Sequence, residues 1–287
     1  MSVAKQLDGE GVKGAQETEL VTQQDPLSQG DIIRIEWPGH MVGPELGVVI
    51  NADCDIAHCK TDGVIAFLPL YHFREYLSEF WVANHIQEVI DSATRTVLRL
   101  ANDEDPAALH AWLSTDAPEA VGQKISEHRS LKNGDSTALM RELNRLAVCL
   151  DGNKEHIQAF KEICLLESDS EKYARTHITA AKKAMGDGHF FISELAGNQS
   201  VGFVIRMRRI YSIQEECVFL SNSDQKSKSI GEIESAFRIA RLTPLYRFKL
   251  LQLFAHQFSR IGLSDETMAL SSLAIDDLVM QFSGDRK

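Results

Sequence analysis

The densest group of chemically reactive side chains in this sequence directly follows an apolar run. Two carboxylates, two thiols and an imidazole stand within seven residues: Asp53, Cys54, Asp55, His58 and Cys59. The preceding run, Leu46–Ile50, is rich in β-branched residues and is typical of a strand buried on both faces. A rigid strand end that reaches solvent is a good support for a reactive group. We call this group the Asp53–Cys59 cluster and take Asp53, Cys54 and Asp55 as candidate catalytic residues.

Several roles are open to the Asp53–Cys59 cluster. As a zinc site, Cys54, His58 and Cys59 would supply soft ligands, although the second closely spaced pair that zinc sites often have is missing. As a nucleophile, Cys54 would need a nearby imidazole, because adjacent carboxylates raise the pKa of a thiol. In a structural role, Cys54 is a small buried residue and the aspartates accept hydrogen bonds from turn amides. We expect neither a metal nor a cofactor.

A fourth role is phosphoryl transfer. An apolar strand followed by Asp53-x-Asp55 resembles the start of haloacid-dehalogenase-like enzymes. The resemblance implies that Asp53 is the nucleophile and that Asp55 handles protonation of the leaving group. The Gly-Thr pair that follows the second aspartate in those enzymes is replaced here by Ile56-Ala57.

Basic residues gather later in the chain. Residues 201–249 contain nine Lys and Arg against five acids, whereas residues 1–60 contain four against ten. Four arginines are candidates for anion binding or internal ion pairs: Arg206, Arg208, Arg241 and Arg247. The first two share a strand face by their period of two, and the last two bracket the start of a helix at Pro244. They would pair with Asp53 or Asp55, form a solvated face, or bind an anionic ligand or nucleic acid.

The elements that must position these residues fall into blocks. Residues 1–27 are polar and aperiodic and are expected to be a disordered tail. The remaining segments are predicted to be the first half of a β-barrel domain (28–79), a helical insertion (80–185), the second half of the barrel (186–243) and C-terminal helices (244–287). The polar stretch 221–230 is expected to be a loop, and residues 265–282 a last amphipathic helix. Three strands alone would leave an exposed edge. The predicted fold is therefore α+β: an SH3-like or partly open β-barrel split by a helical insertion, with a helical C-terminus.

The helical insertion carries apolar side chains at three- and four-residue spacing. One such face continues through Ile157, Phe160, Lys161, Cys164 and Leu165. Helix faces of this kind usually pack against their own domain. We therefore expect core positions, with a partner surface at residues such as Trp112 and Phe160 as the alternative.

Residues 28–70 resemble the opening of the PemK/MazF-type toxins, which are small SH3-like barrels. The matching segments are Gly30-Asp31-Ile32, Leu46–Asp53 and Val64–Leu70. The toxins carry Arg-Pro before the second strand and a hydroxyl after the third, where this chain has Glu45-Leu46 and Leu70. The resemblance thus implies the barrel without the ribonuclease activity. Together with residues 241–247 and 258–263, the segment is also similar to bacterial proteins encoded beside mobile-element or phage-defence genes, which implies an antiviral, toxin-like setting.

Composition narrows the function classes. The chain has 287 residues and a formal net charge of −11, which opposes nonspecific binding to nucleic acid. No run approaches the ~18 apolar residues of a membrane span, and the first residues do not resemble a secretory signal. The five cysteines are scattered, which is typical of reduced thiols in the cytoplasm.

Two functions follow from these features. The first is a cytoplasmic, non-catalytic interaction or adaptor protein with a protein partner, no membrane contact and a disfavoured role for nucleic acid. The alternative is an enzyme that acts on phosphodiesters or nucleotides and uses the Asp53–Cys59 cluster with Arg241 or Arg247.

Overall fold

The computed structural model describes residues 16–39, 41–229 and 233–258, together with Leu273, Ile275, Asp276 and Val279. The strands of these residues are β1 (Thr18–Glu19), β2 (Asp31–Glu36), β3 (Leu46–Val49), β4 (Val64–His72), β5 (His189–Glu194), β6 (Val201–Arg206), β7 (Tyr211–Gln214), β8 (Val218–Phe219) and β9 (Ser235–Leu242). The helices are α1 (Asp53–Ala57), α2 (Phe73–Tyr76), α3 (Val82–Ala101), α4 (Pro106–Thr115), α5 (Pro118–Arg129), α6 (Asn133–Leu150), α7 (His156–Leu166), α8 (Ser170–Ala184), α9 (Asn222–Lys228) and α10 (Pro244–Phe258). A π-helical turn, η1 (Leu77–Trp81), joins α2 to α3, and a 3-10 turn, η2 (Glu215–Cys217), precedes β8.

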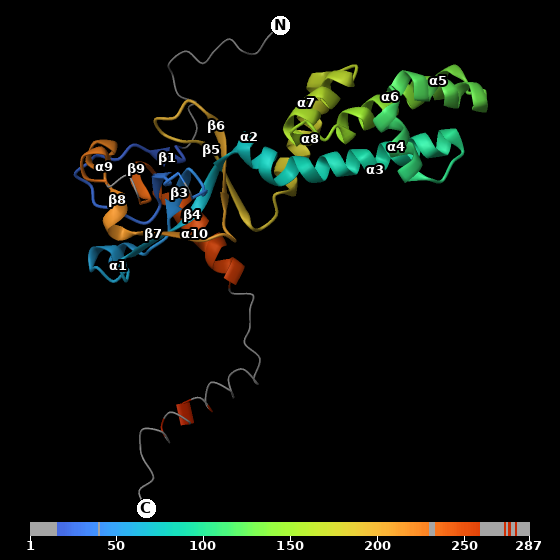
Figure 1. Ribbon diagram of the computed structural model, residues 1–287. Helices are drawn as coiled ribbons and strands as arrows, with labels where there is room; N and C mark the ends of the chain where they lie inside the picture. The colour runs from blue at the N-terminus through green and yellow to red at the C-terminus, as the bar shows by residue number, and fades with distance from the viewer. Residues whose placement is uncertain are drawn as a thin grey trace, which may run out of the picture. The chain divides into compact units, whose positions relative to one another are not determined.

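The predicted fold class is confirmed. The protein is α+β, with a partly open, barrel-like sheet (Figure 1). Helices α2–α8 lie between β4 and β5 along the chain, and α10 follows the last strand. The described residues include no helix that is both long enough and apolar enough to cross a membrane.

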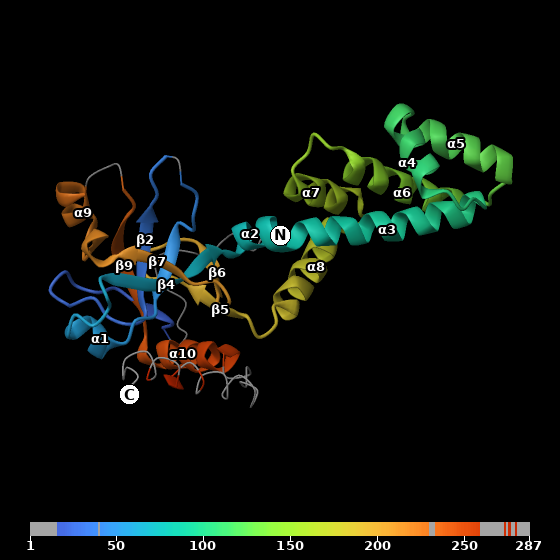
Figure 2. The same cartoon turned by 60° about the horizontal axis from the view of Figure 1, so that its bottom comes forward.

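The chain divides into two compact units, of which the first, here the barrel unit, is Met1–Gly43, Gly47–Pro69 and Arg206–Lys287. Its strands lie in the order β1-β9-β2-β3-β4, with β7 also paired to β4 and β8 to β9. Figure 2 labels β2, β4, β7 and β9 of this sheet. β2 and β9 run antiparallel, from Asp31 opposite Arg241 to Glu36 opposite Ser235. The core is made of inward-facing apolar residues: Ile33, Ile35, Val49, Ile65, Phe67, Ile213, Cys217 and Ala236. The Phe67 ring occupies the place of a side chain at Gly47, so that position requires glycine.

The described part of the predicted tail belongs to this unit. Thr18 and Glu19 pair with Leu242 and Arg241 as strand β1. The hydroxyl of Thr243 donates to the carbonyl of Gln16 at 2.9 Å. The prediction of a disordered tail is therefore wrong for residues 16–27, because the edge of β9 offers this segment backbone partners. Residues 1–15 lie outside the described residues.

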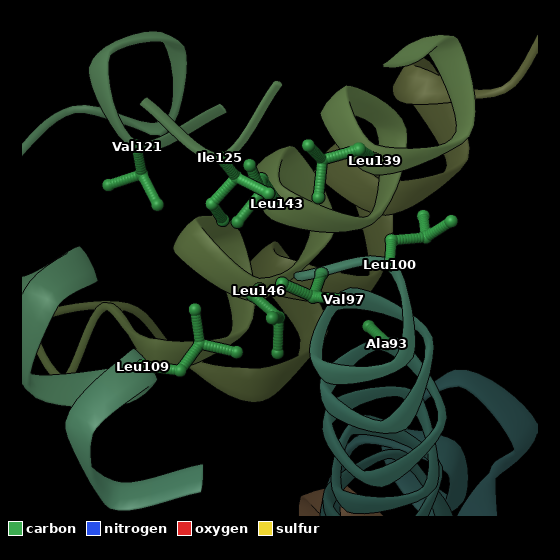
Figure 3. Packing of buried hydrophobic residues seen from close by; sticks show 9 residues of the cluster. All are labelled: Ala93, Val97, Leu100, Leu109, Val121, Ile125, Leu139, Leu143 and Leu146. Carbon is green, nitrogen blue, oxygen red and sulfur yellow. The ribbon is translucent and has the colours of Figure 1, made fainter. Parts of the chain in front are cut away.

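The second unit, here the helical unit, is Pro44–Leu46 and Leu70–Ile205. The end of β4 pairs with β6, and β5 lies beyond β6. Among the helices, α3 packs against α6, and α4 and α5 complete the cluster (Figure 3). Their buried side chains recur at three- and four-residue spacing: Ala93, Val97, Leu100, Leu109, Val121, Ile125, Leu139, Leu143 and Leu146. Asn102 in left-handed conformation ends α3, and Asp105 caps α4 by accepting from the backbone N–H groups of Ala107 and Ala108.

Three segments differ in place or type from the sequence expectation. The sequence predicts residues 186–205 as part of the second half of the barrel; β6 and β5 do continue the sheet beyond β4, but they belong to the helical unit. The expected loop at 221–230 contains helix α9, which Ser221 caps by accepting from the backbone N–H of Asp224 at 3.1 Å. The predicted helix at 265–282 lies outside the described residues, except for four helical positions (273, 275, 276 and 279).

Candidate functional site

The Asp53–Cys59 cluster forms α1, a single helical turn, and the residues directly after it. Asp53 ties this turn to two other segments of the barrel unit. Its Oδ1 accepts a hydrogen bond from the backbone N–H of Gln29 at 2.7 Å, and its Oδ2 lies 3.1 Å from Nη1 of Arg247. Arg247 also donates to the carbonyl of Gln29 at 3.4 Å. Both carboxylate oxygens of Asp53 are thus engaged in holding α1, the start of β2 and α10 together.

Gly30 makes this contact sterically feasible. It has a φ of +85°, and a Cβ placed on it would lie 2.9 Å from Cδ of Arg247. A side chain at this position would be strained by the backbone conformation and would also displace the arginine. Gly30, directly before β2, therefore makes room for the packing of Arg247.

Cys54 and Asp55 do not take part in the contact made by Asp53. Cys54 is exposed, and its Sγ donates to Oδ1 of Asp55 at 3.6 Å. Helical residues two positions apart do not face each other, so Asp53 and Asp55 diverge. The three candidate catalytic residues are neighbours in sequence, but their side chains do not converge on one point.

His58 and Cys59 are exposed at the end of α1. Across the described part of the chain, no three His, Cys, Asp or Glu side chains are grouped so that they could hold a metal ion. The zinc role considered for Cys54, His58 and Cys59 thus gains no support from the geometry.

The main acid–base contact of the barrel unit centres on Asp31, which the sequence analysis did not single out. Asp31 opens β2 and is fully buried. Its Oδ1 lies 2.5 Å from Nε of Arg241, and its Oδ2 lies 3.3 Å from Nη1 of Arg238. The backbone N–H of Ser28 donates to the same Oδ2 at 2.8 Å. The hydrogen bond to Asp31 raises the pKa of Arg241 above its ordinary value. Asp31, Arg238 and Arg241 are called the Asp31 network below.

Backbone carbonyls complete the Asp31 network. The guanidinium of Arg238, 1% exposed, donates to the carbonyls of Thr22, Asp25 and Pro26 at 2.8, 2.9 and 2.9 Å. Arg241 donates to the Pro26 carbonyl as well, at 2.9 Å. Buried charges are tolerated when they are paired and fully hydrogen-bonded. The segment Thr22–Pro26 is ordered because it supplies these acceptors.

Arg206 and Arg208 are placed apart from the Asp31 network in the fold. Arg206 is the last residue of β6 and is half-buried, whereas Arg208 lies in the turn that follows and is exposed. Nε of Arg208 donates to Oε1 of Gln257 on α10 at 3.4 Å. The strand ends before the period of two reaches Arg208, so the two arginines do not share a strand face.

The helical unit contains an open, largely apolar groove of 690 Å³, which we call the α7–α8 groove. Its apolar lining comes from α2, η1, α7, α8 and the start of β6: Phe73, Leu77, Trp81, Ile157, Phe160, Cys164, Leu165, Ala174, Ile178 and Val201. Two of these side chains are strongly exposed, Leu165 at 76% and Val201 at 73%. The groove therefore presents apolar surface to solvent.

One wall of this groove is the helix face predicted from the sequence. All five residues of the helix face predicted at Ile157–Leu165 line it. Phe160 and Cys164 are buried, in agreement with the core interpretation, but Leu165 is exposed. The face is therefore partly core and partly surface, and its spacing alone does not distinguish the two.

A buried imidazole lies behind the groove. His85 is 5% exposed; its ring stacks on Trp81 at 4.6 Å between centroids and lies 5.4 Å from Phe160. Burial, with a smaller contribution from His177, lowers the pKa of His85 to about 4. Its Nε2 has no hydrogen-bond partner among the described residues. At neutral pH the imidazole of His85, which packs against Trp81 and Phe160, is thus uncharged.

A second hollow, of 730 Å³, adjoins the α7–α8 groove and is acidic. The two share Phe73, Arg74, Ile157 and Val201. Glutamates from α2, η1 and the start of α7 line the second hollow: Glu75, Glu79 and Glu155. Burial raises the pKa of Glu75, and the negative charges of Glu79 and Glu45 raise it further. We call these three glutamates the acidic end of the groove.

Comparison of the chain with protein-family models, curated proteins and solved structures finds no match. The geometry of the two units is therefore what bears on function.

Proposed function

We propose that the chain is a non-catalytic interaction protein, in which the barrel unit is a scaffold and the helical unit offers the α7–α8 groove to a protein partner. The observation that carries this proposal is Leu165, which lies within an apolar groove and is nevertheless 76% exposed. Contiguous apolar surface rimmed by charged residues is typical of protein-interaction sites. An adaptor role in a bacterial defence or toxin-like system remains a prediction from the sequence.

The contacts in the barrel unit favour this function over phosphodiester or nucleotide chemistry. Asp53 and Arg247 do meet, as the enzyme hypothesis requires, but Asp53 already accepts from Gln29 and Arg247. Arg241 is held by the buried Asp31. Residues that already bind each other act as tethers of the scaffold, and their use in catalysis would first require these contacts to break.

Site-specific photocrosslinking in the native host tests the proposal. A photoreactive phenylalanine analogue replaces Leu165 in the full chain, and a matched control carries it at Leu20, which is 69% exposed in the barrel unit. We expect one protein to be linked from position 165 and not from position 20. Equal labelling from both positions would count against the groove. Hydrolysis of a phosphodiester by the purified protein, lost in Asp53→Asn, would overturn the non-catalytic assignment.

A further inference from the structure

The α7–α8 groove has two chemically different ends. The groove and the adjoining hollow that contains the acidic end share four lining residues, so they form one continuous surface of the helical unit. A ligand that lies along this surface meets apolar side chains first and carboxylates next. A ligand that complements this surface is therefore apolar at one end and carries positive charge at the other.

The acidic end lacks balancing charge. Among the described residues, Glu75, Glu79 and Glu155 make no ion pair, and Arg74 is the one Lys or Arg that lines this part. Burial is the main cause of the raised pKa of Glu75, and the neighbouring charges of Glu79 and Glu45 add to it. At the apolar end the rim is balanced, with Lys161 on α7 and Glu171 on α8. Positive charge on a partner would therefore be favoured at one end only.

The exposed side chains at the rim of the groove favour a helix over a small ligand as its occupant. Pockets for small molecules bury most of the ligand between their walls. A ligand enclosed in this groove would leave Leu165 and Val201 in water, whereas an amphipathic helix laid across the groove would cover both. Helices recognised in this way present apolar anchors at positions i, i+3 or i+4, and i+7.

We propose, on the basis of the proposed function, that the partner inserts an amphipathic α-helix into the α7–α8 groove. The apolar face of this helix contacts Trp81, Phe160 and Leu165. Lysine or arginine residues at one of its ends lie over Glu75, Glu79 and Glu155. The match between the uncompensated acidic end and a basic helix end fixes the direction in which the helix lies.

Other occupants fit this charge pattern less well. The C-terminal segment of the chain has exposed apolar residues at Leu273, Ile275 and Val279, but the exposed Asp276 lies among them. The sequence continues with a second aspartate at position 277. A segment that carries these acids would bring more negative charge to the acidic end. A second copy of the chain would offer α10, whose exposed apolar residues include Leu245 and Phe248. Of the two Lys and Arg residues on α10, however, Arg247 is already held by Asp53.

Synthetic helical peptides test the inference with the full-length protein. One fluorescent peptide has leucines at i, i+4 and i+7 and three lysines at one end. A second replaces the lysines by glutamates, and a third keeps the lysines but has serines in place of the leucines. Fluorescence anisotropy gives the affinity of each for wild type, for Leu165→Asp, and for a triple variant of Glu75→Gln, Glu79→Gln and Glu155→Gln. Leu20→Asp and Glu119→Gln are the matched controls on exposed positions elsewhere.

We expect the lysine–leucine peptide to bind more tightly than the other two. The triple variant should weaken it about tenfold, with a smaller effect at high salt, because the lost interactions are charged. Leu165→Asp should weaken it more, and the two controls should leave it unchanged. Equal affinity for the lysine and glutamate peptides would contradict the proposal that the partner helix has a basic end. Preference for the serine peptide would contradict the proposal that its apolar face binds the groove.

The peptide and photocrosslinking results separate the two proposals. Crosslinking of one protein from position 165 without binding of any peptide would overturn the helix inference and leave the interaction function standing. Crosslinking of position 165 to the C-terminal segment or to a second copy would also overturn it, by identifying another occupant. Absence of both crosslinking and peptide binding would overturn the interaction function itself.

Discussion

The two units differ in whether their buried charges, exposed apolar side chains and carboxylates find partners within the fold. In the barrel unit, the buried Asp31 is surrounded by two guanidinium groups, whose remaining donors reach the carbonyls of Thr22–Pro26. In the helical unit, Leu165 is left in solvent and the glutamates of the acidic end have no ion pairs among the described residues. Groups that are satisfied internally stabilise a fold, whereas groups left unsatisfied are available to a partner. The comparison predicts that mutations in the first region cost stability and mutations in the second cost binding.

The largest effect is expected at Asp31. Asp31→Ala leaves the guanidinium groups of Arg238 and Arg241 without their carboxylate in the interior. Removing one partner of a buried ion pair costs about 3–5 kcal/mol in free energy of unfolding. Chemical denaturation measures this loss. Asp55→Ala is the matched control, because among the described residues the carboxylate of Asp55 accepts just the thiol hydrogen bond of Cys54. It should change stability by less than about 0.5 kcal/mol. Equal losses in the two variants would show that the Asp31 network does not stabilise the barrel.

The next effect is a pH dependence that originates in the helical unit. The pKa of His85 is about 4 in the folded chain, against an ordinary value of 6.5. Between these values the unfolded chain binds the proton and the folded chain does not, so stability is present above pH 6.5 and is lost as the pH falls towards 4. The loss amounts to about 3 kcal/mol once the pH is below both values. It should disappear in His85→Phe, which removes the titrating ring but keeps an aromatic side chain next to Trp81.

The measurement is the difference in free energy of unfolding between wild type and His85→Phe from pH 7 to pH 4. Carboxylates that titrate in the same range cancel in this difference. His128→Gln, at an exposed position at the end of α5, is the control and should follow the wild-type curve. Parallel curves for wild type and His85→Phe would contradict the lowered pKa and, with it, the uncharged support behind the groove.

A smaller effect is expected at Asp53. Its side chain is 51% exposed, so the ion pair with Arg247 is partly screened by water. The hydrogen bond from the backbone of Gln29 is the larger contribution. Asp53→Ala should therefore cost about 1 kcal/mol, and Asp53→Asn less, because an amide oxygen can still accept from that N–H group. Chemical denaturation of both variants checks the order. Loss of a catalytic activity with unchanged stability would instead indicate that Asp53 belongs to an active site.

Much of the local structure could be predicted from the sequence. The apolar runs at Leu46–Ile50 and Val64–Leu70 become β3 and β4, and the spacing from Ile157 to Leu165 becomes a face of α7. The spacing of apolar residues, by two in a strand or by three and four in a helix, depends on residues that are neighbours in the sequence. It can therefore be recognised before the fold is known. The polar composition of residues 221–230 resembles a loop, but the stretch contains a helix-start pattern. Ser221 precedes Asp224 by three positions, as at the start of a helix, and α9 begins there.

The Asp31 network could not be predicted in this way. Asp31 and Arg238 are 207 positions apart, and Asp31 and Arg241 are 210 apart. The sequence shows a surplus of acids early and of bases late, which indicates pairing but not the partners. The acids considered were Asp53 and Asp55, because they stand in a cluster. Asp31 stands alone at a strand start, where an aspartate usually serves a turn, and only the register of β2 against β9 brings it opposite Arg241 and within reach of Arg238. The openness of the groove at Leu165 likewise depends on which helices pack together.

The smallest effect on stability, and the sharpest separation of the two regions, is expected at Leu165. Leu165→Asp places a charge on a side chain that is 76% exposed, so the free energy of unfolding should stay within about 0.5 kcal/mol of wild type. Ile163, two positions earlier on α7, is fully buried, and Ile163→Ala should cost about 2–5 kcal/mol. Leu165→Asp should nevertheless weaken binding of the lysine–leucine peptide more than about tenfold, whereas Ile163→Ala should weaken it only under conditions in which the variant unfolds. A marked loss of stability in Leu165→Asp would mean that this side chain supports the fold of α7. The contrast between a barrel unit whose charged groups are satisfied internally and a helical unit that leaves groups unsatisfied would then fail at Leu165.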